Sequence, residues 1–288
     1  MIVAHNAGEL PLAERAVALG SFDGVHVGHR AVLDAAKESG ARTTVVTFWP
    51  HPRVVLGNRV ALLSSLERRL ELLGDEGIDE TLIVEFTPEL ARLEPRDFAE
   101  SILRRIGARV VAVGENFRFG RGASGTPALL AELGFDVKAI GLVAGASSTQ
   151  IRRLLGDGEV EDAAKLLGRP PELEGIVVLG DQRGGTLGYP TANLDVPPDL
   201  IVPAFGIYAG SALGHRAAVS IGVNPHYGGA ERRVEPYLLD FDGDLYGRRL
   251  VVELWRRLRD ERAFASEQEL VEQIARDVEE TRAATRPV

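Results

Sequence analysis

The sequence contains no cysteine, and this absence removes several chemistries at once. Disulfides, cysteine-ligated zinc, iron–sulfur clusters and thiol nucleophiles all need a residue that the chain lacks. A chain without cysteine also fits a reducing compartment. Lysine is scarce: Lys37, Lys138 and Lys165 are the only lysines among 33 basic residues. None of them stands in a phosphate-binding loop of the GxxxxGKS or GxxxxGKT type, so a Walker-type NTPase is not expected.

Long apolar runs and an excess of positive charge are absent as well. No stretch approaches the roughly 18 consecutive apolar residues that a membrane-spanning helix needs. The first twenty residues lack the basic start and apolar core of a secretory signal. Because 42 acidic residues outnumber the 33 basic ones, a broad nucleic-acid-binding surface is not expected. We therefore expect a cytoplasmic protein that binds neither membrane nor nucleic acid. The sequence does not indicate an oligomeric state.

The first part of the chain alternates short apolar runs with helical patterns. Runs rich in valine and isoleucine predict strands at residues 15–20, 42–48, 81–86, 109–114 and 135–141. Strands that alternate with helices favour a doubly wound parallel sheet with helices on both faces. Ligands bind such a sheet at the carboxyl ends of its strands, where two glycine-rich segments, 20–28 and 114–125, are expected to lie.

The pattern changes after the segment GRPP at residues 168–171, which we interpret as a linker. Short β-rich runs recur at residues 175–179, 206–211, 216–222, 234–241 and 249–255, with turns between them. This spacing predicts a small antiparallel barrel, followed by a helix from about Ser266. We therefore predict an α/β domain over residues 1–168 and a β-barrel domain with a C-terminal helix over residues 172–288.

The segment GSFDGVHVGH, residues 20–29, follows a predicted strand and opens a predicted helix. Free backbone N–H groups and the positive end of the helix dipole suit a phosphate at such a position. His26 and His29 are three residues apart, so they face the same side of a first helical turn and can stabilise charge on an α-phosphate during nucleotidyl transfer. Two histidines in an ordinary glycine-rich turn are the alternative. We predict ATP contacts from Gly20, Phe22, Asp23, Gly24, His26 and His29.

The segment SSTQIRR, residues 147–153, places hydroxyls at a helix start beside two guanidiniums. Both groups are good triphosphate ligands. On its own the segment is better explained as a solvated helix start with surface arginines. Together with the histidine segment it predicts that Ser148, Thr149 and Arg152 complete an ATP site.

Residues 180–194 form the densest polar segment of the second half. The side chains of Thr191 and Asn193 point to the same side of an extended chain, and their oxygens suit Mg²⁺ bound to nucleotide phosphates. The motif alone is also compatible with a loop that turns at Pro190. Gly180, Gly184 and Gly188 would allow the segment to cover phosphates, so we predict that all five residues contact ATP.

Glu235 stands in an otherwise apolar predicted strand. Near a phosphate site, a carboxylate can accept the proton of a substrate alcohol, which makes Glu235 a candidate general base. A strand residue that faces outward and pairs with an arginine is the alternative.

The two N-terminal segments together closely resemble the adenylyltransferase half of prokaryotic bifunctional FAD synthetases. The motif PTAN at residues 190–193, with Glu235 and DLYG at residues 244–247, resembles the riboflavin kinase module of the same family. The first resemblance covers nearly all of residues 15–170 and the second about residues 172–280. Together the two resemblances imply a nucleotidyltransferase (Rossmann-like) domain followed by a small Greek-key barrel.

The resemblance also implies roles for these residues. The barrel would phosphorylate riboflavin to FMN, with Thr191 and Asn193 binding Mg²⁺ and ATP and Glu235 as the catalytic base. The N-terminal domain would transfer AMP from ATP to FMN, giving FAD and pyrophosphate. His26, His29 and Arg152 would contact ATP there as catalytic residues. We further predict flavin contacts from Asn116, Phe117 and Tyr246.

Five positions depart from the family pattern, and two other functions remain as alternatives. The departures are Trp49, Asn116, Thr126, Gly185 and His226. One alternative is a nicotinate-nucleotide or pantetheine-phosphate adenylyltransferase, which shares the HxGH motif but has no place for the PTAN barrel. The other is a flavin-binding or regulatory protein that has lost one activity. The intact histidines and Glu235 argue against it.

Overall fold

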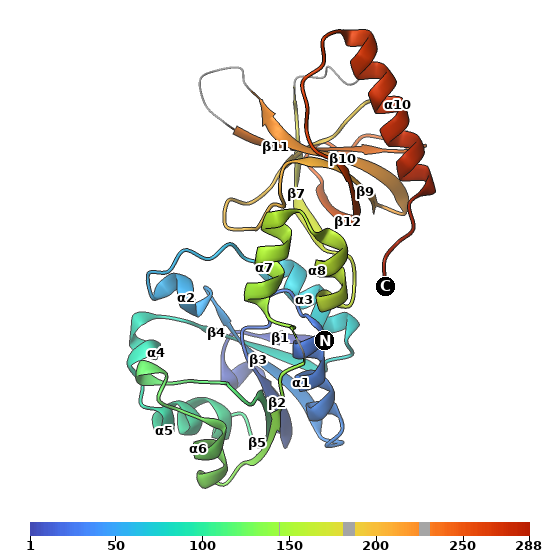
Figure 1. The fold of residues 1–288 in the computed structure, drawn as a ribbon. Helices are drawn as coiled ribbons and strands as arrows, with labels where there is room; N and C mark the ends of the chain where they lie inside the picture. Colours follow the sequence, from blue (N-terminus) through green and yellow to red (C-terminus); the bar gives the residue numbers. More distant parts are fainter. Residues whose placement is uncertain (144, 181–187, 225–230) are drawn as a thin grey trace. The chain divides into compact units, whose positions relative to one another are not determined.

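The computed structural model describes residues 1–143, 145–180, 188–224 and 231–288 (Figure 1). The chain forms two compact units, Met1–Ser148 and Thr149–Val288. Each unit has its own six-stranded sheet. The division into functional halves at residues 168–172 stays a prediction.

The first unit is built on a parallel sheet in the order β1-β4-β3-β2-β5-β6. Its strands are β1 (Ile2–Ala4), β2 (Arg15–Leu19), β3 (Arg42–Trp49), β4 (Glu80–Glu85), β5 (Ala108–Gly114) and β6 (Asp136–Ile140). The five predicted strands are confirmed, within a residue or two at their ends. The edge strand β1 was not predicted, because three residues are too few to show a hydrophobic period. The strand order reverses between β2 and β5, which is where a doubly wound sheet binds ligands.

Helices cover both faces of this sheet, as predicted. They are α1 (Val27–Lys37), α2 (Pro52–Val55), α3 (Leu66–Asp75), α4 (Pro88–Arg92), α5 (Pro95–Phe98), η2 (Ala99–Arg104) and α6 (Pro127–Glu132), with short turns η1 (Ala7–Glu9) and η3 (Arg121–Ala123). Alternate residues of β2 enter different cores. Ala16 and Ala18 pack with residues of α1 and α3, whereas Val17 and Leu19 pack with residues of α5, η2 and α6.

The second unit is an antiparallel sheet in the order β11-β10-β9-β12-β7-β8. Its strands are β7 (Glu172–Val178), β8 (Asn193–Asp195), β9 (Gly206–Ala212), β10 (His215–Asn224), β11 (Glu231–Leu238) and β12 (Arg249–Arg259). The two end strands meet, because the N–H of Ala192 donates to the carbonyl of Pro236 at 2.9 Å. This contact brings the sheet round into the predicted barrel.

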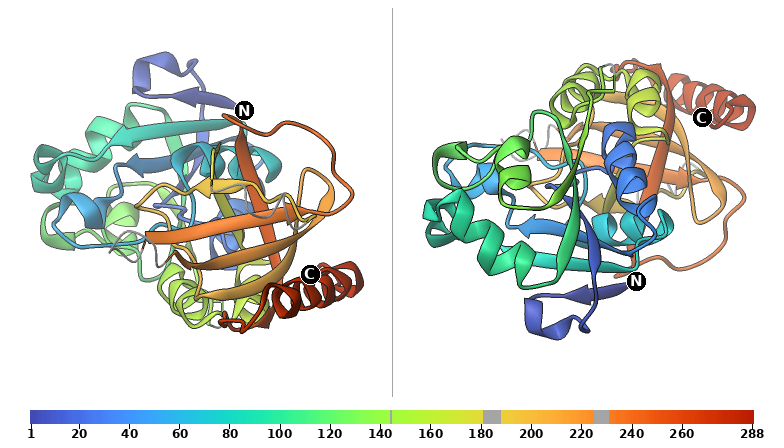
Figure 2. Two further views of the ribbon diagram at one scale, coloured as in Figure 1. Left: turned by 90° about the horizontal axis from the view of Figure 1, so that it is seen from above. Right: turned by 90° about the horizontal axis from the view of Figure 1, so that it is seen from below.

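Among the residues that the structure describes, three helices accompany the barrel: α7 (Ser148–Asp157), α8 (Val160–Leu167) and α10 (Glu267–Ala283). Helix α8 contacts β12, and α10 contacts β9 and β10 (Figure 2). The predicted start of α10 is confirmed, because the Ser266 hydroxyl accepts a hydrogen bond from the N–H of Glu269 at 3.2 Å. A side-chain cap of this kind satisfies one of the free N–H groups of a first helical turn.

A buried ion pair joins the amino ends of the parallel strands. Glu80 has no exposed surface and accepts hydrogen bonds from Arg15 Nε at 2.7 Å, Arg42 Nη1 at 2.9 Å and Thr44 Oγ1 at 2.9 Å. Burial by itself raises the pKa of Glu80, but the hydrogen bonds from Arg15, Arg42 and Thr44 outweigh it and hold the pKa below its usual value. The folded protein therefore keeps this carboxylate charged.

Replacing Glu80 by glutamine leaves the buried charge of Arg15 without its carboxylate. We expect Glu80→Gln to lower the free energy of unfolding by about 3–5 kcal/mol near neutral pH. Because the folded-state pKa lies below the unfolded value, near 4.5, this stabilisation is present above that pH and disappears as the pH falls through the folded pKa. The variant should therefore lose less stability on acidification than the wild type. Urea unfolding at neutral and acid pH measures the difference, and equal losses in both proteins would contradict it.

Candidate functional site

The predicted histidine segment lies at the carboxyl edge of the first sheet and has an unusual backbone. The N–H of Gly20, just after β2, donates to the carbonyl of Val46 in β3 at 3.1 Å. Phe22, Gly24 and Val25 then have φ angles of 49°, 79° and 37°, in the left-handed region that side chains rarely adopt. At Gly24 a Cβ would lie 2.8 Å from the side chain of Leu63, so only glycine fits. Strain of this kind often occurs at ligand sites.

The structure brings His26 and His29 together at the start of α1. Their rings stack with centroids 3.6 Å apart and an interplanar angle of 15°. His26 caps the helix, because its Nδ1 accepts a hydrogen bond from the N–H of His29 at 3.3 Å. A Cβ at Gly28 would lie 3.1 Å from the ring of His26, so a larger residue at position 28 would crowd this ring. Two adjacent imidazoles at the positive end of a helix can bind a phosphate and stabilise charge that develops on it.

Asp23 joins separate segments around these histidines. Its carboxylate, only 1% exposed, accepts hydrogen bonds from the backbone N–H groups of Leu63 at 3.0 Å and Ser64 at 3.2 Å. Its carbonyl accepts a hydrogen bond from the hydroxyl of Ser148 at 3.1 Å. Both Asp23 and Ser148 were predicted as ATP contacts. The hydrogen bonds also give them a role in holding the segment in shape, while contact with ATP stays a prediction.

Arg69 in α3 was not predicted as part of the site. It is fully buried, with Nη2 3.7 Å from the carboxylate of Asp23 and its guanidinium 5.6 Å from the ring centre of Trp49 at the end of β3. In the sequence it is one of two adjacent arginines on an amphipathic helix, which carries no functional signal. Trp49 appeared there only as a departure from the family pattern.

The predicted flavin residues of this unit follow β5, next to the reversal of strand order. Asn116 is exposed, and Phe117 is partly buried and stacks on Phe119 with ring centres 6.0 Å apart. The departure at Thr126 has a physical explanation, because its hydroxyl caps α6 by accepting from the N–H of Leu129 at 3.2 Å. Threonine and the expected aspartate are both favoured at such a position. Contact with flavin stays a prediction.

Thr149 and Arg152 belong to the second unit. Both lie in α7, where Thr149 is exposed and Arg152 is partly buried. Their contact with ATP stays a prediction.

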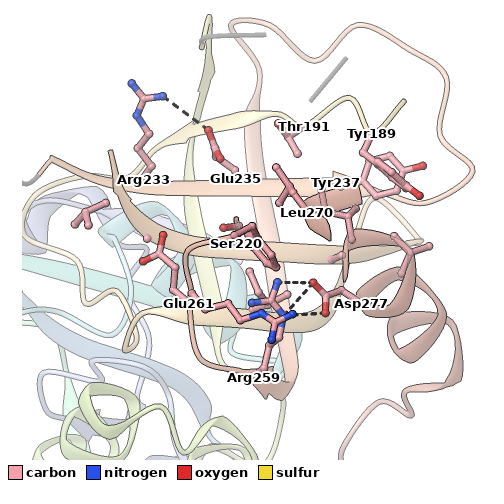
Figure 3. A pocket seen from close by; sticks show the side chains of 18 of the residues that line it. Tyr189, Thr191, Ser220, Arg233, Glu235, Tyr237, Arg259, Glu261, Leu270 and Asp277 are labelled. Carbon is pink, nitrogen blue, oxygen red and sulfur yellow. Dashed lines mark hydrogen bonds and ion pairs between the residues drawn. The ribbon is translucent and has the colours of Figure 1, made fainter. Parts of the chain in front are cut away.

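A cavity of about 390 Å³ in the second unit contains the predicted kinase residues Thr191, Asn193 and Glu235. This volume is in the range of small-molecule sites, about 300–1,000 Å³. Its walls are formed by strands β9, β10 and β11, the end of β12, the residues next to β8, and α10 (Figure 3). The structure thus brings together residues that are 44 positions apart in the sequence, from Thr191 to Glu235.

The register of β10 and β11 makes room for this cavity. Each long side chain that β11 directs into the cavity stands opposite a small residue of β10: Arg233 opposite Gly222, Glu235 opposite Ser220 and Tyr237 opposite Ala218. Directly opposite residues of an antiparallel pair are close neighbours, so three large partners would fill the space.

Backbone contacts hold Thr191 and Asn193 near Glu235. The Ala192–Pro236 hydrogen bond attaches the residue between them to the neighbour of Glu235. Asn193 lies against the backbone of Gly180, where a Cβ would be 2.0 Å from its side-chain nitrogen. A side chain at position 180 would therefore displace the amide of Asn193. A hydroxyl and an amide oxygen placed together fit Mg²⁺, which prefers few protein ligands and binds through substrate phosphates. In the described ranges no group of three or more histidine, aspartate or glutamate side chains could hold a metal ion.

The residues that form the C-terminal wall of the cavity were not predicted from the sequence. Asp277 of α10, 4% exposed, accepts hydrogen bonds from Arg259 at the end of β12, from Nε at 2.9 Å and from Nη2 at 2.6 Å. The apolar side chains of Phe264, Leu270 and Ile274 also line the cavity. The signal in the sequence was weak: Asp277 follows three residues after Ile274, beside the apolar stripe of the helix.

Other predicted residues lie elsewhere. Tyr246 is 52% exposed, in a turn where its N–H donates to Asp244 Oδ1 at 2.9 Å, and it does not line the described cavity. Gly188 is exposed. Gly184, Gly185 and His226 lie outside the described residues. The roles predicted for these residues stay predictions.

Known protein families match the N-terminal and C-terminal parts of the chain separately. A family model described as FAD synthetase matches residues 11–151, and one described as riboflavin kinase matches residues 167–285. A bifunctional riboflavin kinase/FMN adenylyltransferase of Listeria monocytogenes is 35% identical, over 93% of this chain and 92% of that protein. Its namesake in Escherichia coli is 36% identical, over 95% of this chain and 93% of that protein.

A solved structure extends the likeness to the fold. A Streptococcus pneumoniae crystal structure named as a macrolide-efflux protein is 31% identical and covers 98% of both chains, with a TM-score of 0.87. In the described part of this chain, no helix is both long and apolar enough to cross a bilayer. The two family models and the curated relatives agree over nearly the whole length. The chain therefore belongs to the bifunctional riboflavin kinase/FMN adenylyltransferase family.

Proposed function

We propose that the chain converts riboflavin to FAD in two ATP-dependent steps. Residues 172–288 phosphorylate riboflavin to FMN, and residues 1–168 transfer AMP from a second ATP to FMN. One observation carries the kinase assignment: Thr191, Asn193 and Glu235, chosen from the sequence for phosphoryl transfer, line one cavity. The family to which the chain belongs supports both activities.

In the kinase step Glu235 is the general base. It accepts the proton of the terminal ribityl hydroxyl while that oxygen forms a bond to the γ-phosphorus of ATP. The bond from this phosphorus to the bridging oxygen breaks, and ADP leaves with the electron pair. Thr191 and Asn193 would hold Mg²⁺, which supplies positive charge to the ATP phosphates when it is bound. The apolar side chains of Phe264, Leu270 and Ile274 offer a surface for the flat flavin ring.

In the adenylyl-transfer step a phosphate oxygen of FMN attacks the α-phosphorus of ATP, and pyrophosphate leaves. His26 and His29 stabilise the charge that develops on the α-phosphate, because both rings stand at the positive end of α1. Asp23 keeps them in position through its hydrogen bonds to Leu63 and Ser64. The family resemblance also assigns Arg152 a phosphate contact through its guanidinium.

A single incubation tests the overall assignment. The full-length protein with riboflavin, ATP and Mg²⁺ should yield FAD, detected after chromatographic separation of the flavins. FMN as the final product would contradict the adenylyltransferase step, and unchanged riboflavin would contradict the kinase step.

Removing the imidazoles should stop the second step alone. We expect His26→Asn and His29→Asn to lower FAD formation from FMN by on the order of 10²-fold or more, as for lost oxyanion donors. Asparagine is chosen because it caps a helix start as well as His26 does, which limits the structural damage. Phosphorylation of riboflavin should continue at the wild-type rate.

The exposed His5 supplies the matched control, since His5→Asn changes the same group away from the site. Normal FAD output from the His26 and His29 variants, at unchanged KM for ATP, would exclude the assigned role of the imidazoles.

Replacing Glu235 should have the opposite selectivity. Glu235→Gln keeps the shape of the side chain but cannot accept a proton, so kcat for riboflavin phosphorylation should fall by roughly 10²–10⁴-fold. Added FMN should still become FAD. Asp242→Asn, at an exposed turn of the same unit, is the control and should leave both rates unchanged. A Glu235→Gln protein that phosphorylates riboflavin normally would show that another group is the base.

A further inference from the structure

The guanidiniums that line the described cavity are not equivalent. Arg259 is engaged by both carboxylate oxygens of Asp277, and Arg262 donates to Gln273 at 2.9 Å. Arg233 lies at Glu235 instead, with Nη1 3.9 Å from Oε1. The side chains of this pair are 27% and 31% exposed, so both can be reached from the cavity. Arg233 is therefore a cavity-lining guanidinium that lies next to the proposed base.

Strand geometry gives Arg233 the same orientation as the base. Side chains alternate along a strand, so positions 233, 235 and 237 of β11 share one face, and all three line the cavity. Figure 3 shows the side chains of Arg233 and Glu235 extending to one side of β11, toward each other. Gly222 stands opposite Arg233, and the carboxylate of Glu261, another cavity residue, lies against Gly222, where a Cβ would be 2.2 Å from Glu261 Oε1.

The chemistry of phosphoryl transfer uses a cation at this place. The transferring phosphoryl group carries charge on three oxygens, and a guanidinium can neutralise it with two parallel N–H donors. A second edge of the same guanidinium can hold the carboxylate of the base. Arginine suits this double task better than lysine, because its five donors point in fixed directions.

We propose that Arg233 is a phosphate-binding residue of the kinase site, and that it holds the transferring phosphoryl group while it keeps Glu235 in place. This inference rests on the proposed kinase function of the second unit. Because the binding is realised as charge develops in the reaction, Arg233 should contribute to kcat more than to the affinity for riboflavin.

The test compares two neighbouring arginines of one strand. Arg233→Gln should lower kcat for riboflavin phosphorylation by on the order of 10²-fold and leave KM for riboflavin unchanged. Arg233→Lys keeps the charge without the forked donors, so its kcat should lie between those of the wild type and the glutamine variant. Arg232→Gln is the control, because Arg232 is exposed, points to the other face of β11 and does not line the cavity. It should behave as the wild type.

The outcomes separate this inference from the proposed function. If Glu235→Gln is inactive as a kinase but Arg233→Gln has wild-type kcat, the role of Arg233 is overturned and the proposed base stands. If Glu235→Gln is fully active, the proposed mechanism itself is wrong. A change confined to KM for riboflavin in Arg233→Gln would also overturn the inference.

Conversion of added FMN to FAD and the thermal unfolding midpoint report on folding in every variant. Should Arg233→Gln fail to fold, Arg233→Lys decides alone. A lowered kcat in a folded lysine variant supports the proposal, and a wild-type kcat overturns it.

Discussion

A buried carboxylate that must be neutralised lies at the base of each unit's site. Asp23 and Asp277 are 1% and 4% exposed, and an isolated charge at such a place costs several kcal/mol. Arg69 and Arg259 supply the opposite charge, and further donors, backbone N–H groups at Asp23 and the amide of Gln273 at Asp277, form hydrogen bonds with the carboxylate oxygens. Each carboxylate thereby joins segments that are distant in the sequence, beside the histidines of the first unit and in the wall of the cavity of the second.

The same paired geometry recurs at other ion pairs of the second unit. A guanidinium binds a carboxylate through two parallel N–H groups, which an ammonium group cannot do. Arg282 with Asp240 and Arg286 with Glu253 repeat the forked geometry of Arg259 with Asp277. The net charge of −9 is therefore compatible with anionic substrates. What matters is the local charge: helix N-termini and guanidiniums stand at the sites, while much of the acidic excess is paired or faces solvent.

The two sites illustrate different ways of making space for a phosphate. In the first unit, glycine and left-handed backbone bring N–H groups and imidazoles to the edge of a sheet. In the second unit, the register of two strands makes the space, because small residues of β10 stand opposite the functional side chains of β11. Both solutions leave room that a typical packed core would fill with side chains. The arrangement in each unit is decided by backbone geometry before any functional side chain is placed.

Local pattern in the sequence was enough for most of the fold and part of the sites. Apolar runs of five to eight residues identify β2 to β6, and Ser266 identifies the start of α10, because these signals depend only on neighbouring residues. Motif chemistry indicated His26, His29, Thr191, Asn193 and Glu235, and the resemblance to a known family assigned their roles. Strand β1 was missed because its three residues are too few to show a hydrophobic period.

Tertiary structure alone decided which distant side chains meet. Arg69 pairs with Asp23 over 46 positions, and Arg259 with Asp277 between a strand and a helix, so no local pattern could indicate either pair. The place of Arg233 in the cavity depends on its register against Gly222, which the sequence does not reveal. Tyr246 belongs to the recognised motif DLYG, yet it lies in an exposed turn. The sequence thus determined the elements and the reactive groups, whose signals are local. Packing and strand pairing, which act over long separations, decided how these groups are combined.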